Sequence, residues 1–165
     1  MWMHMSLAIT FLAVFAYDFL YKSSIGKNTR VATLISFALI AGFIYLMSCC
    51  ANFGPRLYNI QIGAMFGTMM AFNVWFRIWP AQQRIITAIK DGDAPDGADV
   101  ALAGLRSKHN TYMSVPLIWT MINQHTVVFS GKLFDCSGLV LLIVIALGWH
   151  IVFQLYKKSG KIKGF

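Results

Sequence analysis

The residues of this chain that could do chemistry are few, and most lie in or beside apolar stretches. Asn73 and Arg77 stand four positions apart within an apolar run, and side chains at this spacing share one face of a helix. A guanidinium in such a place can reach lipid headgroups, pair with a carboxylate such as Asp18, or hold an anionic ligand such as a haem propionate. The sequence leaves these three uses open.

Four histidines are candidate haem ligands, because a neutral imidazole binds haem iron well. His125 lies near the outer end of one expected membrane span, and His150 shares a helical face with Gln154 in another. The easier geometric pairs would be His125 with His4 on the outer side, or His150 with His109 on the inner side. Each histidine could instead be an interfacial hydrogen-bonding residue. Apart from haem iron at His125 or His150, no metal site is expected.

The three cysteines do not suggest a metal centre. Cys49 and Cys50 are adjacent, and Cys136 is expected on the same outer side of the membrane. Two adjacent thiols supply too few ligands for a structural zinc. A disulfide between Cys136 and one of the pair and free buried thiols are both compatible with the sequence.

The composition is that of an integral membrane protein. Of 165 residues, 58% are hydrophobic and only 12% are charged, with a mean hydropathy of +0.62, which is too apolar for a soluble domain of this size. The net charge of +8 comes from basic residues at the ends of apolar runs, not from a patch interleaved with exposed aromatics, so a nucleic-acid partner is not expected. The chain contains no glutamate and no glycine-rich nucleotide loop, so no complete catalytic constellation is apparent.

Five stretches approach the roughly 20 residues that a helix needs to cross a bilayer. The sequence therefore predicts an all-α bundle of about five transmembrane helices, forming one membrane domain over residues 1–165. Twelve of the fourteen Lys and Arg residues then fall on one side, which places the N-terminus outside and the C-terminus in the cytoplasm. The expected spans are 2–21, 31–53, 60–79, 112–130 and 137–156.

Residues 81–110 form the expected cytoplasmic loop. A helix should continue to about Lys90, the segment DGDAPDG should break it, and Ala98 to Lys108 can form a short second helix. In the preceding span, the series Gly63, Gly67 and Ala71 predicts a face of small residues along which another helix can approach closely.

Two long motifs resemble a known family. The segments QIGAMFGTMMAFNVWFRIWPAQQR and RSKHNTYMSVPLIWTMINQH are similar to the later half of the membrane domain of the PuuD urate hydroxylase family, over about Gln61 to His125. Members carry more spans and often a C-terminal cytochrome c. The resemblance implies a redox protein of a bacterial-type inner membrane that oxidises urate and passes electrons to a c-type haem. His109, Asn110, Pro116 and His125 match the family pattern.

The departures from that family bear on activity. The family pattern has a histidine where this chain has Gln61, and an amide lacks the imidazole nitrogen that ligates haem iron. The chain also has no CxxCH segment, so it attaches no c-type haem. These departures predict that the chain is not catalytic alone.

Three functions remain. The favoured one is an accessory subunit of a larger membrane electron-transfer or oxidoreductase complex, retaining a haem b or quinone contact. The second is a urate-oxidising membrane enzyme of the PuuD type, and the third is a structural subunit that packs against other helices and binds lipid. The partners expected are other membrane subunits and phospholipid.

Overall fold

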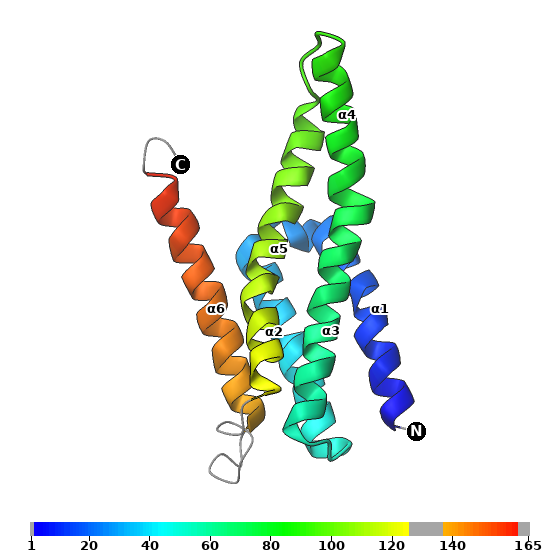
Figure 1. Ribbon diagram of the computed structural model, residues 1–165, viewed down its shortest axis with the longest axis vertical. Coiled ribbons are helices and arrows are strands. Elements are labelled where there is room, and N and C mark those ends of the chain that lie inside the picture. The colour runs from blue at the N-terminus through cyan, green and yellow to red at the C-terminus, as the bar shows by residue number, and fades with distance from the viewer. Residues whose placement is uncertain (1, 126–136, 162–165) are drawn as a thin grey trace.

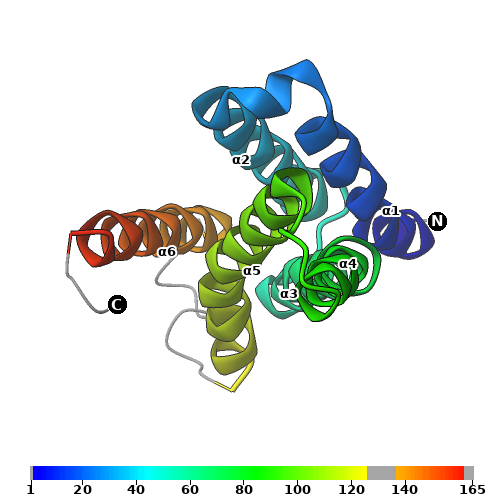
Figure 2. The same cartoon turned by 90° about the horizontal axis from the view of Figure 1, so that it is seen from above.

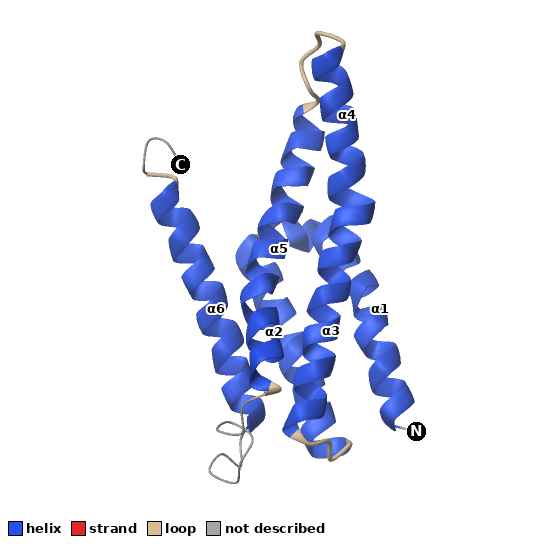
Figure 3. Ribbon diagram, in the orientation of Figure 1, coloured by secondary structure: helices blue, strands red, loops and turns tan. Residues whose placement is uncertain are grey.

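The computed structural model describes residues 2–125 and 137–161, and these residues form helices joined by short connections, with no strand among them (Figure 1, Figure 3). The all-α prediction is therefore confirmed. One 3₁₀ segment, η1 (Ser24–Lys27), and two π-helical segments, η2 (Leu46–Cys50) and η3 (Val74–Ile78), lie between or within the longer elements. The α-helices are α1 (Trp2–Lys22), α2 (Thr29–Tyr45), α3 (Pro55–Asn73), α4 (Trp79–Lys90), α5 (Gly97–Asn123) and α6 (Ser137–Ser159).

Three of the helices are long and apolar enough to cross a membrane: Trp2–Lys22, Thr29–Cys50 and Gly138–Ser159. Their flanks carry many exposed large apolar side chains, as expected of surfaces that face lipid rather than water. On α1 these include Phe11, Leu12, Phe15 and Phe19. The chain is thus membrane-like in composition and surface, whereas the five-span count and the orientation stay predictions.

One continuous helical rod runs through the π segment η3 from Pro55 to Lys90. The residues at both junctions, Val74 and Trp79, have helical dihedral angles. Pro80 is the second residue of α4, two positions beyond the end of η3, and proline inside a helix can neither donate a backbone hydrogen bond nor tolerate a tight preceding turn. A wider π turn at this point accommodates it and sets the direction in which Arg77 projects.

The connections follow local rules. After α1, the backbone turns so tightly that a Cβ on Gly26 would lie 2.7 Å from the carbonyl oxygen of Tyr21, so only glycine fits there. Asp96 caps α5, its Oδ1 accepting from the N–H of Ala98 at 2.9 Å. The expected short helix at Ala98 to Lys108 is not separate, because capping at Asp96 starts one helix that continues to Asn123. The part of the fourth expected span beyond 125 lies outside the described residues.

The hairpin of α4 and α5 extends past the level at which α1 ends and α2 begins (Figure 1). Viewed from above, α1, α2, α3 and α5 are grouped together and α6 lies to one side, next to α5 (Figure 2). The apolar core lies at the centre of this group and comes mainly from α3, with contributions from its neighbours: Val14, Ile40, Phe43, Ile44, Met47, Tyr58, Ile62, Met65, Phe66, Met69, Met113, Leu141 and Ile145.

A small residue, Gly63, allows α3 and α5 to approach closely, but the other small residues of the expected series do not take part in this contact. A Cβ on Gly63 would lie 2.5 Å from Oγ1 of Thr120, whereas one on Gly67 would meet nothing within 4 Å. Ala71 is exposed. Positions four apart drift by about 40° around a helix, so the series leaves the α5 contact after its first member. The prediction of a continuous packing face holds for Gly63 alone.

Candidate functional site

The candidate site is a polar cluster around Asp18, near the end of α1. Arg77 of η3 binds this carboxylate in a bidentate manner: Nε donates to Oδ1 at 3.0 Å, and Nη2 donates to Oδ2. Arg106 of α5 donates from Nη2 to Oδ1 at 2.8 Å. Lys22, one turn further along α1, lies 3.1 Å from Oδ2. One carboxylate thus pairs with cations from three elements.

Amide side chains extend the cluster toward the bundle interior. Asn73 is fully buried, and its Nδ2 donates to the hydroxyl of Tyr17 at 2.9 Å and to Oδ1 of Asn110 at 2.8 Å. Asn110 in turn donates to the backbone carbonyl of Met70 at 3.2 Å. Nη1 of Arg106 lies 3.5 Å from Oδ1 of Asn73. These side chains join α1, α3 and α5, mostly by bonds to one another and once by a bond to a backbone carbonyl.

A tyrosine and a histidine complete the cluster. The hydroxyl of Tyr17 lies 2.7 Å from Nδ1 of His109, a short hydrogen bond. The ring of Tyr21 packs on the ring of His109 at a centroid distance of 4.3 Å, and the Arg106 guanidinium lies 5.2 Å from the centre of the Tyr17 ring. Because Tyr17 accepts from Asn73, its own hydroxyl proton is available to donate to Nδ1 of His109.

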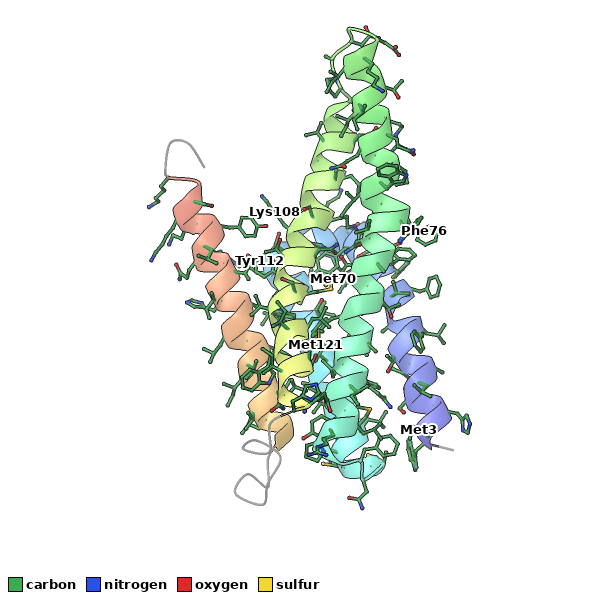
Figure 4. All side chains as sticks on the ribbon, in the orientation of Figure 1. Met3, Met70, Phe76, Lys108, Tyr112 and Met121 are labelled. Atoms are coloured by element: carbon green, nitrogen blue, oxygen red, sulfur yellow. The ribbon has the colours of Figure 1, made fainter. Side chains whose placement is uncertain are left out.

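Helical spacing explains how the cluster assembles. Arg106, His109 and Asn110 occupy positions i, i+3 and i+4 of α5, so they project from one face. Tyr17 and Tyr21 are four apart on α1. These residues of α5 reach α1 and the end of α3 through their hydrogen bonds, and Lys108, which lies between them in sequence, is labelled on α5 in Figure 4.

The polar pair Asn73 and Arg77 is part of this cluster. Of the three uses open for Arg77, the ion pair with Asp18 is present. Asn73 turns to Tyr17 and Asn110 instead. Sequence reasoning took His109 as a candidate haem ligand, and it did not single out Arg106 or Tyr17 as site residues. The one-face spacing of Arg106, His109 and Asn110 was the available signal for a site.

The candidate haem ligands are not brought together by the described chain. His4, His125 and His150 all lie on exposed surface. His150 shares a hydrogen bond with Gln154 at 3.2 Å, as their spacing on α6 allows, and only His109 belongs to the polar cluster. The described residues contain no group of three or more His, Cys, Asp or Glu side chains that could hold a metal ion.

Gln61 is buried and engaged with α1. Its Nε2 donates to Oγ of Ser6 at 3.0 Å, and Oγ1 of Thr10 lies 3.5 Å from its Oε1. The position therefore serves contact between α1 and α3. Cys49 and Cys50 are free and exposed in the described structure, so the alternative of buried thiols is wrong for this pair. Cys136 lies outside the described residues, and with it the alternative of a disulfide.

One comparison with known proteins identifies a family. A family model described as urate oxidase N-terminal matches residues 1–163, nearly the whole chain. No curated protein and no solved structure matches the chain. The match extends well beyond the segment from Gln61 to His125 that carries the resemblance in the sequence. This chain belongs to the urate oxidase N-terminal family.

Proposed function

We propose that this chain is an accessory integral-membrane subunit of a larger electron-transfer or oxidoreductase complex. In this proposal it crosses a bacterial-type inner membrane five times, with its N-terminus outside and its C-terminus in the cytoplasm. Within the urate oxidase N-terminal family, we propose that the chain is related to membrane urate hydroxylases of the PuuD type. Family membership supports a urate-related redox setting.

One observation supports the accessory role. The polar side chains of the chain form two sets: an interior set whose members hydrogen-bond to one another, and a set of exposed histidines. Most donors and acceptors of the interior set are used by neighbours in the same chain, as in Asp18 with Arg77 and Arg106, although Nε of Arg106 has no acceptor among the described residues. His4, His125 and His150 lie on the surface, where a partner subunit can reach them. This division suits a chain that completes a site formed with another subunit.

The described histidines do not fit a haem pocket enclosed by this chain alone. A six-coordinate haem b needs two axial side chains facing each other across the iron, whereas His150 faces Gln154 on its own helix and His125 is exposed just past the end of α5. Any haem b or quinone contact is therefore proposed at a surface shared with a partner, with His125 or His150 contributing from this side.

A spectrum of the complex, isolated under conditions that keep partners attached, tests this proposal. We expect comigration with a larger complex on a native gel, and a haem Soret band that His125→Ala or His150→Ala weakens. Gln154→Ala is the matched control for His150, since it removes the hydrogen-bond partner and keeps the imidazole. A stable monomer that is active alone would overturn the accessory role.

The second candidate function is a membrane urate-oxidising enzyme. The observation that favours it is the family match together with the hydrogen bond between Tyr17 and His109, which lies beside Arg106 and supplies a candidate general acid or base. Urate-dependent reduction by the isolated chain, abolished in His109→Gln, would select this function. Retention of the complex with no haem and no urate chemistry would select the structural, lipid-binding role instead.

A further inference from the structure

We propose that the cluster of Lys22, Arg77 and Arg106 around Asp18 binds a phosphate group, either the headgroup phosphate of an anionic lipid or free phosphate. The inference does not depend on which of the functions above is correct. It concerns charge, hydrogen bonding and access at one end of α1.

The charge of the cluster is unbalanced. Three cations pair with Asp18, and among the residues that the structure describes no second carboxylate pairs with any of them. Two positive charges therefore remain uncompensated beside a side chain, that of Arg106, which is only 2% exposed. Because charge at low dielectric strongly favours a counter-ion, an anion is the expected occupant.

The hydrogen bonding of the cluster is also incomplete. Nε of Arg106 is buried and has no acceptor among the described residues, although a buried guanidinium normally has all its donors used. Nη1 of Arg77 makes only a long contact of 3.5 Å with the carbonyl oxygen of Phe76. Arg77 thus keeps a donor that an acceptor from outside the bundle can reach, whereas the unpaired Nε of Arg106 is enclosed and adds to the positive potential of the cluster.

The cluster can be reached from outside the bundle. The side chain of Arg77 is 23% exposed and that of Lys22 is 54% exposed. Their neighbours Phe19, Phe76 and Trp79 are exposed apolar residues, and Phe76 projects away from the bundle in Figure 4. Cations bordered by outward aromatics are typical of the boundary between hydrocarbon and headgroups, where lipid phosphates lie.

The types of side chain favour phosphate. Guanidinium donors bind oxyanions in a fork, and a flexible lysine ammonium serves as a point charge on phosphate oxygens. Lys22 is joined to Asp18 by one exposed contact, so it can turn to a ligand at little cost.

Titration of the purified full-length chain in an uncharged detergent tests the site. The probes are short-chain phosphatidylglycerol, short-chain phosphatidylcholine and inorganic phosphate, followed by tryptophan fluorescence and by phosphorus NMR line width. We expect saturable binding of phosphatidylglycerol or of inorganic phosphate, with phosphatidylcholine weaker. Saturation by phosphatidylglycerol without competition from phosphate identifies a lipid site, whereas competition identifies a site for the free ion.

Two variants within the cluster and one control variant outside it test whether binding depends on these cations. Arg77→Gln and Lys22→Gln should each weaken binding about tenfold, the usual effect of losing one charge-assisted contact. Arg30→Gln, an exposed cation at the start of α2, removes the same charge elsewhere and should change binding by less than about twofold. If Arg77→Gln unfolds the chain, the result for Lys22→Gln alone tests the site, because the Lys22 side chain is largely exposed and its replacement should not affect folding. No saturable binding, or equal losses in all three variants, would overturn the proposal.

Discussion

Arg106 and Asp18 lie 88 positions apart in the chain and form an ion pair of 2.8 Å between α5 and α1. The guanidinium is almost wholly buried, and the carboxylate is only 10% exposed. A buried pair of this kind contributes little net stability, but breaking it by removing one partner leaves the other charge buried and unpaired. The intact pair therefore adds little to the free energy of unfolding, whereas removing either partner should strongly destabilise the contact between α1 and α5.

Asp18→Asn should be strongly destabilising for this reason. Three cations would lose their carboxylate, and we expect the free energy of unfolding to fall by about 3 kcal/mol. Denaturant or thermal unfolding in detergent measures the change. The control is Asp99→Asn, which breaks the exposed pair with Arg84 and should change the midpoint far less. Similar losses in both variants would show that Asp18 is not a buried anchor.

Gly63→Ala should destabilise the protein by straining the contact between α3 and α5. The added methyl group would lie 2.5 Å from Oγ1 of Thr120, and overpacking of this kind typically costs about 1–3 kcal/mol. Gly67→Ala adds the same atom in open space, so it should be neutral or stabilise the helix by up to about 1 kcal/mol. The double variant Gly63→Ala with Thr120→Ala should recover part of the loss in thermal unfolding. A stable Gly63→Ala single variant would contradict the close contact.

The fold class followed from the sequence because apolar run length and composition are local properties. Run lengths placed α1, α2 and α6 near their observed bounds, and the segment DGDAPDG was correctly expected to end one helix before the next begins. The continuation of the helix past Pro80 to Lys90 was predicted, and the π turn η3 ends just before it, although such turns have no clear sequence signature. What the run lengths missed was the continuity of α5, which is one helix from Gly97 to Asn123.

The site was predictable only in part. Asn73 and Arg77 stood out because polar groups are rare in apolar helices, and Asp18 was one of the partners considered. Tyr17 gave no signal, since an aromatic residue near a membrane boundary is ordinary. Its role depends on which helices become neighbours, which requires the tertiary arrangement of α1, α3 and α5.

The hairpin of α4 and α5 should respond to acid through Asp99. The hydrogen bond and charge of Arg84 lower the pKa of Asp99, so the folded state holds this carboxylate ionised more strongly than the unfolded state does. The stabilisation is present above the unfolded pKa of about 3.9 and is lost as the pH falls through the lower folded pKa. Amide exchange at the hairpin should therefore differ between the wild type and Asp99→Asn at about pH 6, and the difference should shrink toward pH 3. Asp93→Asn, in the neighbouring turn, is the matched control, and a pH-independent difference would rule out the ion pair as its cause.

Tyr17→Phe tests whether the short bond to His109 organises the cluster. The variant keeps the ring and removes the hydroxyl that accepts from Asn73 and bonds Nδ1 of His109. Asn73 would still donate to Asn110, but the imidazole would lose its partner, so we expect a loss of about 1–2 kcal/mol in the free energy of unfolding.

Tyr21→Phe is the control for that variant, because its hydroxyl makes only a 3.4 Å contact with Ser36 while its ring also packs on His109. It should cost less than about 0.5 kcal/mol. A double-mutant cycle between Tyr17→Phe and His109→Ala then isolates the hydrogen bond from the ring contacts, since the rings of Tyr17 and Tyr21 pack against His109 at 5.8 Å and 4.3 Å. A coupling energy well above that of the cycle with Tyr21→Phe supports a cluster organised by the bond. Equal coupling in the two cycles would mean that aromatic packing alone holds His109 in place.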